Sequence, residues 1–272
     1  ASRAGAVGIF NAELEADGIG IVDSLVRLQR HAGGEFGVKF GSDDFYQANA
    51  TVTGPASDDL SVRFTGLFRD RGSQVDGVKA QRIYVAPTFT WDLGPGTQLT
   101  GLAYYQYDDV KGDTNGFLPA IGTRFENPLG QIKQSTNLGE PDYNRYVRKQ
   151  YMIGYDFVHA FSDAVKFSQN VKWSGYNEDQ KVIYSGGLLD ANFDGTPDDY
   201  RTVTRNSFPY HEEVYGFAAD NRLSADFTTG AITHNLLFGI DYRNIKNHAV
   251  FGFGFATGGN IDIFDPVYGQ VP

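Results

Sequence analysis

Cysteine is absent from this sequence of 272 residues, and methionine occurs only once. Without cysteine, the chain can hold neither a disulfide framework nor a thiolate metal site. Basic residues are also in the minority, because 23 Lys and Arg stand against 33 Asp and Glu and give a formal net charge of −10. Nucleic-acid binding requires a basic face that neutralises phosphates, so this charge argues against a nucleic-acid partner.

Long apolar runs are missing as well. No stretch of eighteen apolar residues occurs, which excludes a transmembrane helix. The first residues, from Ala1 onward, show neither the basic nor the apolar region of a signal peptide. The sequence has no HExxH, no GxSxG and no P-loop, and its five histidines lack the spacing of paired metal ligands. We therefore expect no enzymatic activity and no resident cofactor.

The sequence is rich instead in aromatic residues and glycine, with 21 Phe, 16 Tyr and 33 Gly. From Gly34 onward, apolar and polar residues alternate with a period of two, which is typical of β-strands with one apolar face. The expected strands lie at about 45–53, 60–71, 80–92, 97–109, 148–161, 164–174, 210–228 and 231–243. They reach about ten to eighteen residues, whereas strands of soluble domains typically have about five or six.

The connections between these strands alternate in length. Short turns are expected at 54–59, 93–97, 162–164 and 229–231, and longer loops at about 72–79, 110–147 and 183–209. Short turns at one end and long loops at the other are the layout of an outer-membrane β-barrel. The predicted fold is therefore all-β: an antiparallel, transmembrane outer-membrane β-barrel that faces lipid, of which about nine or ten strands are present.

Two further patterns favour the barrel. Charged residues within the strands lie opposite the apolar set, as they must if they face the lumen rather than lipid. Trp91, Phe161 and Phe227 each lie beside a short turn, where an aromatic girdle would meet the membrane interface. The charged residues concerned are Lys166, Lys172, Asp220, Arg222, Asp226, Asp241 and Arg243.

In its longer motifs the chain resembles the TonB-dependent siderophore receptors, the ferrichrome-receptor branch in particular. The resemblance runs from about Gly34 to Gly269 and rests on "GSDDFYQANATVTGP", "VRFTGLFRDRGSQVD", "RIYVAPTFTW", "GFLPAIGT", "NLGEPDYNRY", "IGYDFVHAFSD", "FSQNVKWS", "LLFGIDY" and "DIFDPVYG". Members of the family import ferric siderophores across the bacterial outer membrane. Their barrels have about 22 strands and a plugged lumen.

This resemblance implies the organisation of the chain. Residues 34–272 would be the first part of the barrel. Residues 1–33, in which 20–31 could form a short amphipathic helix, would be a segment that precedes it, either a remnant of the junction with the plug or unstructured. The chain is then expected to be a fragment without the plug, through which the TonB–ExbB–ExbD complex would energise transport.

The resemblance also implies two ligand-binding residues. Phe117 in "GFLPAIGT" occupies the place of an aromatic at the ligand mouth, and Tyr184 in "KVIYSGGL" matches a second aromatic at the start of the next long loop. Rigid aromatics supply contact area to a compact chelate at low entropic cost. The ligand would be a ferric siderophore, of the hydroxamate type. Asn115 and Gly186 depart from aromatic positions of the family. The simpler alternative is that Phe117 packs the core of its own loop.

One stretch has the form of a calcium loop. In "DANFDGTPDD", Asp190, Asn192 and Asp194 alternate ahead of a glycine, and hard cations bind such converging oxygens. The twelfth position, which should carry a bidentate Glu, is Arg201. A polar surface turn is therefore the simpler interpretation.

Two other classes of function remain open. A passive porin-type channel would share the barrel but select solutes through a charged constriction. A soluble β-sandwich, such as a carbohydrate-binding module, would use the same alternation to build a core between two sheets.

Overall fold

The computed structural model describes residues 32–114, 116–255 and 257–269, and this part of the chain is built from strands. The strands are β1 Gly33–Gly41, β2 Phe45–Pro55, β3 Leu60–Arg71, β4 Lys79–Gly94, β5 Thr97–Lys111, β6 Arg145–Ala160, β7 Val165–Leu188, β8 Thr202–Thr229, β9 Ile232–Phe251 and β10 Asn260–Asp262. The described residues contain no helix, so none that is long and apolar enough to cross a membrane.

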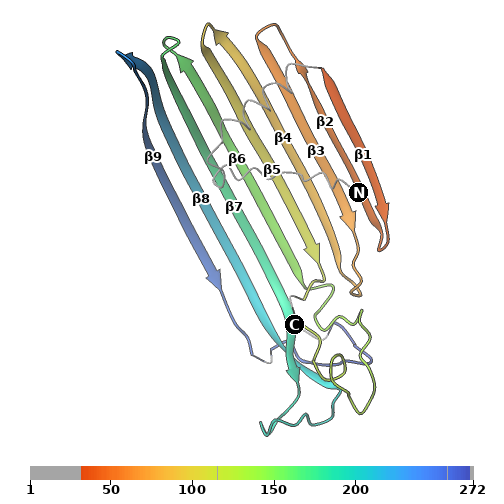
Figure 1. Cartoon of the computed structure of the whole chain (residues 1–272). Helices are drawn as coiled ribbons and strands as arrows, with labels where there is room; N and C mark the ends of the chain where they lie inside the picture. The colour runs from red at the N-terminus through yellow and green to blue at the C-terminus, as the bar shows by residue number, and fades with distance from the viewer. Residues whose placement is uncertain (1–31, 115, 256, 270–272) are drawn as a thin grey trace.

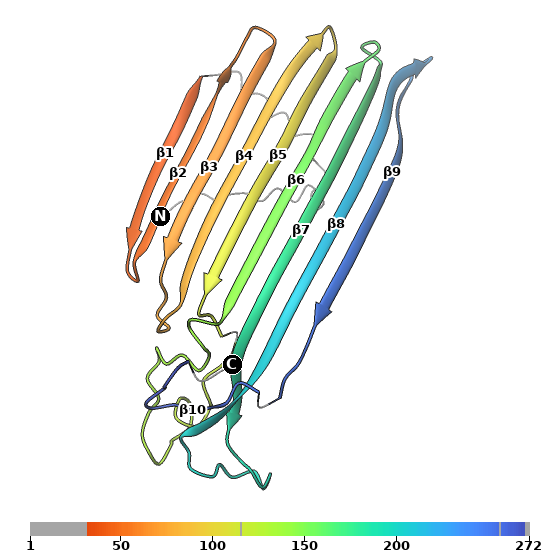
Figure 2. The ribbon, with the colours of Figure 1, turned by 180° about the vertical axis from the view of Figure 1, so that it is seen from behind.

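The strands form one antiparallel sheet in which strands β1 to β9 follow one another in space as they do in sequence (Figure 1). Within the described residues, β1 and β9 each pair on one side only, so the sheet is open. Short links at 56–59, 95–96, 161–164 and 230–231 lie at one end, and the links 42–44, 72–78, 112–144 and 189–201 lie at the other (Figure 2). The alternation of short and long connections is confirmed, except that the first link at the loop end is also short.

The register gives the sheet one apolar and one polar face. Cross-strand partners share a face, and the pairs Val62–Phe89, Ile153–Trp173 and Leu223–Phe238 place the apolar residues of successive strands together. These side chains are widely exposed, for example Phe36 at 72% and Phe238 at 66%. The charged residues expected in the lumen, from Lys166 to Arg243, all fall on the opposite face. This part of the prediction is confirmed.

Glycines on the apolar face lie under aromatic rings of the neighbouring strand. A Cβ atom at Gly101 would lie 2.1 Å from the ring of Phe89, its cross-strand partner, and one at Gly175 would lie 2.3 Å from the ring of Tyr151. Each ring thus covers a backbone position that has no side chain. This arrangement restores apolar contact where glycine would otherwise weaken a strand.

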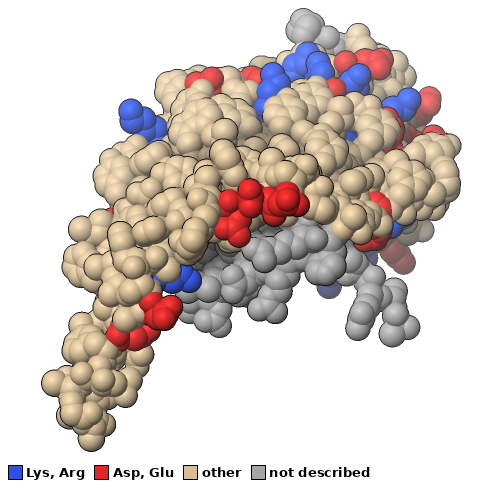
Figure 3. Space-filling model, turned by 90° about the horizontal axis from the view of Figure 1, so that it is seen from above, with Lys and Arg blue, Asp and Glu red and all other residues tan. Residues whose placement is uncertain are grey.

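The short-turn end carries the expected aromatics. Trp91 and Phe227 lie near the ends of β4 and β8, Phe161 lies in the turn after β6, and all three are exposed. His159 and His234 contact Phe161 and Phe227, with ring centroids 4.6 and 4.8 Å apart. Seen from above, acidic and basic side chains are interspersed among broad uncharged areas (Figure 3).

One boundary prediction is wrong. Residues 183–188 and 202–209 are not loop but the ends of β7 and β8, which have 24 and 28 residues. A shift in register between Ser185 and Gly187 breaks the alternation in β7 and hides the strand in the sequence. In β8, residues up to Thr204 pair with β10 and residues from Tyr210 onward pair with β9. Pro209 lies between these two pairings, so the missing N–H of the proline costs little.

The buried apolar core lies among the loops rather than on the sheet. Ile132 and Leu138 from the loop 112–144 pack with Val203 of β8 and with Ile261 and Ile263 beyond β9. A sandwich would need a second sheet packed on the first, whereas the described strands form a single sheet, so the soluble alternative is wrong. Residues 1–31 of the predicted N-terminal segment 1–33, including the possible helix at 20–31, lie outside the described residues. Asn115 lies outside them as well.

Candidate ligand-binding mouth

The site is built at the loop end of the sheet, from the loop 112–144, the adjoining ends of β7 and β8, and the chain that follows β9. This is the end at which the long loops gather below the strands in Figure 1. The chain after β9 does not continue the hairpin series. It folds back along β8, first through the bridge between Ser207 and Gly254 and then through β10.

Two buried asparagines fix the loop 112–144 to its surroundings. Asn137 donates to the carbonyls of Asp76 and Gly112 at 2.8 and 2.9 Å and accepts from the amide of Gly139. Asn144 donates to the carbonyls of Asp113 and Ile183 and accepts from the amide of Ile183. Each side chain thus replaces missing backbone partners. The loop is therefore anchored at both ends to defined neighbours.

Gly139 makes this close packing possible. A Cβ atom at this position would lie 2.4 Å from Nδ2 of Asn144 and 2.8 Å from the carbonyl oxygen of Ile183. Any side chain would therefore push the loop away from β7. The glycine is required here by close approach rather than by an unusual backbone conformation.

A buried ion pair lies at the centre of the loops. Arg205 of β8 and Glu140 of the loop 112–144 are 0% and 3% exposed, with Nη1 of the arginine 2.9 Å from Oε1 of the glutamate. Arg205 also donates to the carbonyls of Gly139 and Gly259. The other glutamate oxygen accepts from the amide of Gly269. Burying two charges is expensive unless they are paired and hydrogen-bonded, and here backbone groups supply most of the partners.

Phe117 stands out from this anchored loop. Its side chain is 89% exposed, while the next residue, Leu118, packs against the buried loop core. Phe117 therefore does not pack the core of its own loop, and that alternative is wrong. An aromatic ring held in solvent by a fixed loop has its whole face available to a ligand.

Tyr184 lies beside the loop that carries Phe117. It is half-buried, belongs to β7 rather than to the start of a loop, and stands opposite Asn206 on the polar face. A Cβ atom at Gly116 would lie 3.3 Å from Cβ of Tyr184. The structure therefore brings the two predicted ligand residues into one neighbourhood, while their binding role stays a prediction.

Besides Phe117 and Tyr184, a group of aromatic residues that the sequence analysis did not identify lies at the loop end. Phe208 and Tyr210 of β8 stack at 5.9 Å, Phe208 lies 4.9 Å from Phe253, and the exposed Phe251 and Phe255 extend the series. We call these five residues the aromatic ladder. The signal was present as "FGFGF" at 251–255, in which aromatics alternate with glycine.

The aromatic ladder shares a face with Tyr184. Phe208 is the diagonal neighbour of Tyr184 across the β7–β8 pair, since Asn206 lies directly opposite the tyrosine. Diagonal neighbours lie within reach of aromatic side chains. Phe117, Tyr184 and the aromatic ladder thus all lie at the loop end of the sheet, and we take them as the candidate ligand mouth. Phe117, Phe251, Phe253 and Phe255 are exposed, and the other rings are half-buried.

Charged residues cross the polar wall on the sheet side of this mouth. The register aligns one row of six strands through Arg69, Arg82, Asp108, Arg148, Glu178 and Glu212. Arg82 pairs with Asp108, and Arg148 pairs with Glu178 at 3.5 Å while lying over the rings of Tyr146 and Tyr176. The wall is therefore polar and hydrogen-bonded, as a surface facing a wet or filled lumen must be.

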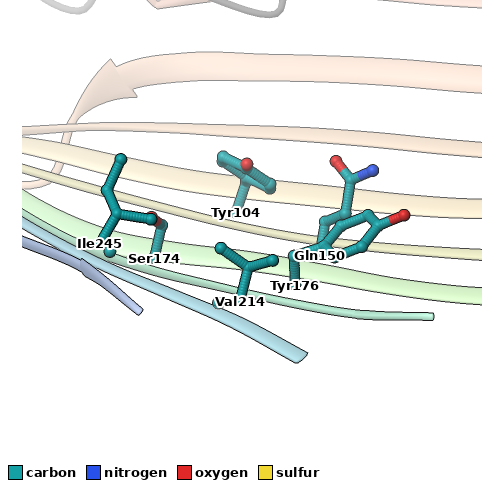
Figure 4. Close-up of a pocket in the computed structure, with 8 residues that line it drawn as sticks. Tyr104, Gln150, Ser174, Tyr176, Val214 and Ile245 are labelled. Carbon is teal, nitrogen blue, oxygen red and sulfur yellow. The ribbon is translucent and has the colours of Figure 1, made fainter. Parts of the chain in front are cut away.

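The same wall carries a shallow hollow. It measures about 170 Å³ and is lined by side chains that rise from one face of the sheet, among them Tyr104, Gln150, Tyr176 and Val214 (Figure 4). Pockets that enclose ligands usually span about 300–1,000 Å³. This hollow is too small for a metal chelate.

The predicted calcium residues lie in the exposed link 189–201. Asp190 accepts from the amides of Asp194 and Gly195 at 3.2 and 2.8 Å. The amide of Thr196 and the side chain of Asn192 lower the pKa of the Asp194 carboxyl. These contacts are those of a tight turn. In the described part of the chain no group of three or more acidic, His or Cys residues is placed to hold a metal, and the calcium role stays a prediction.

A second ion pair joins this link to the chain beyond β9. Arg201 lies 2.6 Å from Asp262, which also accepts from the amide of Phe264. Partial burial opposes ionisation of Asp262, but the amide hydrogen bonds and the guanidinium outweigh it and lower the pKa of this carboxyl. Asp262 is therefore charged at neutral pH and fastens the loops at a point removed from the aromatic mouth.

Comparison with known proteins adds relatives of known role. No family model matches the chain. The ferrioxamine B receptor of Salmonella typhimurium is 32% identical over 243 residues, which cover 89% of this chain and 33% of the relative. The ferrichrome outer membrane transporter/phage receptor of Escherichia coli is 30% identical over 229 residues, covering 80% of this chain and 30% of that protein. The chain thus spans about a third of the length of the curated relatives it matches.

Solved structures show the same fold. The ferric-catecholate import receptor Fiu of Escherichia coli superimposes with a TM-score of 0.74 at 20% identity, covering 88% of this chain and 38% of that chain. The ferripyoverdine receptor of Pseudomonas aeruginosa gives 0.70 at 18% identity, with coverage of 82% and 29%. Identities this low speak to architecture alone: the open sheet corresponds to part of a closed outer-membrane barrel.

Proposed function

Since this chain belongs to the family of TonB-dependent siderophore receptors, of which it supplies part of the barrel, we propose that the complete protein binds and imports a ferric siderophore. Its place is the bacterial outer membrane, with the apolar face of the sheet toward lipid. The observation that carries the proposal is the candidate aromatic mouth, since Phe117, Tyr184 and the aromatic ladder all lie at the loop end.

The ligand is a ferric chelate of the hydroxamate type. Support comes from the relatives in sequence, which are named for ferrioxamine and ferrichrome. The mouth fits this chemistry, because exposed rings give contact area to the ligand's carbon skeleton and the Tyr184 hydroxyl can donate to the chelate oxygens. The iron travels as part of the cargo. The protein itself needs no resident cofactor and performs no catalytic step.

Transport is energised from outside this chain. A polar wall like that of β3 to β8 suits a lumen filled by a separate folded plug. In the proposal that plug belongs to the complete protein and contacts the TonB–ExbB–ExbD complex. Binding at the mouth then precedes a plug movement that admits the chelate, so uptake depends on energy whereas binding does not.

The test is uptake of radioactive iron by iron-starved cells that express the complete protein. We expect accumulation from ferric ferrioxamine B or ferrichrome, saturable in chelate and abolished by a protonophore. Cells without the protein are the control. Uptake that is linear in concentration and insensitive to the protonophore would instead establish a passive channel.

A further inference from the structure

The pair Arg205–Glu140 is buried and therefore cannot contact the ligand, yet it lies where two loop segments meet. Arg205 donates Nη1 to the carbonyl of Gly139 at 2.9 Å and Nε to the carbonyl of Gly259 at 3.3 Å. Its own backbone carbonyl accepts from the amide of Gly258 at 3.0 Å. One residue of β8 thus holds both the loop 112–144 and the segment 257–269.

Glu140 closes the arrangement from the other side. It is contributed by the loop 112–144, and its Oε2 accepts from the amide of Gly269 at 2.8 Å. Next to it, Tyr268 donates its hydroxyl to the carbonyl of Asn137 at 2.9 Å. The segment 257–269 is therefore tied to Arg205 of β8 at its first residues and to the loop 112–144 at its last residues. Arg205 and Glu140, which join these two attachments, pair with each other.

A buried charge pair is a poor means of stabilisation alone. Well-packed apolar residues of the same volume often do as well or better, whereas a pair fixes one arrangement of its surroundings. Here Nη2 of Arg205 and Oε1 of Glu140 lack a hydrogen bond of good geometry within the described residues. The pair is thus costly to bury, which favours a role in fixing loop positions.

Resting on the function proposed above, we propose that Arg205 and Glu140 form a latch that positions the two halves of the ligand mouth. The loop 112–144 carries Phe117, and the chain entering the segment 257–269 carries Phe253 and Phe255 of the aromatic ladder. Both residues are positioning residues, because both are buried away from the mouth. The latch sets the distance between the rings, and this distance selects a chelate of matching size.

The experiment uses the complete receptor with nitroxide labels on the variant pair Gln134→Cys and Val267→Cys. Both positions are exposed, and this chain contains no cysteine of its own. Pulsed electron–electron double resonance then measures the distance between the labels on the two loop segments. The latch predicts a single narrow distribution in the parent and a broad one in Arg205→Met, which keeps bulk but removes the charge and the donors.

Ligand affinity is measured on the same variants. Arg205→Met should weaken binding of the ferric hydroxamate about tenfold or more, and the milder Glu140→Gln should weaken it less. The matched control is Lys133→Met. Lys133 lies on the loop 112–144, and its substitution removes an exposed ion pair with Asp76, so neither readout should change. Retention of heat-modifiable mobility on gels shows that the barrel remains folded in each variant.

The outcomes separate the two proposals. Unchanged distances and affinity in both Arg205→Met and Glu140→Gln would overturn the latch. If the parent binds no ferric chelate while the distances broaden in Arg205→Met, the proposed function fails and the positioning role stands. If binding and distances change together and Lys133→Met changes neither, the latch is supported.

Discussion

The side chain of Asn144 pairs with the backbone of Ile183 as a neighbouring strand would, with Nδ2 donating to the carbonyl at 2.8 Å and Oδ1 accepting from the amide at 2.7 Å. The pair joins the end of the loop 112–144 to β7 one residue before Tyr184. It connects the loop that bears Phe117 to the strand that bears the second aromatic.

Asn144→Ala should release this loop. The substitution leaves the amide and carbonyl of Ile183 buried without their partner, at a cost of about 1–3 kcal/mol for each group. Hydrogen exchange in the complete receptor should rise around 183–185 and in the loop, while the barrel strands stay protected. The exposed Gln134→Ala on the same loop is the control. Equal protection in the two variants would contradict the anchoring role.

Phe117→Ala should weaken ligand binding without loss of stability. The ring is 89% exposed, so its removal opens no cavity in the fold. A ring that contacts the ligand at the centre of a mouth often contributes about 1–3 kcal/mol. Titration calorimetry measures the change. Phe193→Ala is the matched control, because Phe193 is 90% exposed on the link 189–201; equal losses in both variants would show a nonspecific effect.

Gly101→Ala should destabilise the barrel wall through one contact. The added Cβ would lie 2.1 Å from the ring of Phe89, so the ring must leave its place. Overpacking of this kind typically costs about 1–3 kcal/mol. The temperature at which folded mobility on gels is lost should fall, and Phe89→Ala in the same chain should restore part of it. Gly239→Ala, whose nearest contact would be 3.6 Å, should have little effect.

Acid should loosen the fastening between Arg201 and Asp262. Because the pKa of Asp262 is lowered in the folded loop, its contribution to stability is complete above its ordinary pKa of 3.8. The contribution is lost as the pH falls from that value through the lowered pKa. A fluorescent label on Val267→Cys should gain mobility in this range.

Arg201→Met serves as the companion variant for this transition. It removes the guanidinium that favours the charged carboxylate, so the midpoint should move upward toward 3.8. An identical midpoint with and without Arg201 would show that the ion pair does not control the transition.

Much of the sheet could be predicted from the sequence, because a wall that faces lipid on one side and polar groups on the other imposes strict alternation. β3 matches its predicted bounds, and β2, β4 and β5 differ from theirs by a few residues at most. The prediction failed where alternation ceases to be required. Just before the bulge at Ser185, β7 is covered by loops, and Ile183 is buried on the face that points to lipid elsewhere.

The mouth was predictable only in part. Phe117 and Tyr184 could be named as ligand residues because their short motifs resemble those of the receptor family, and the structure places both at the loop end. Arg205, Glu140, Asn137 and Asn144 could not, because their function depends on partners that lie far apart in sequence. Arg205 and Glu140, for example, are brought together only by the fold-back of the chain along β8. No periodic pattern records such a contact.

The most direct test is calorimetric titration of the detergent-purified complete receptor with ferric ferrioxamine B, ferrichrome and a ferric catecholate. We predict saturable binding of a hydroxamate chelate with a Kd below about 1 μM, equivalent to about 8 kcal/mol. The catecholate should bind far more weakly, and Phe117→Ala should reduce the hydroxamate affinity. A folded receptor that binds none of the three chelates would contradict the account.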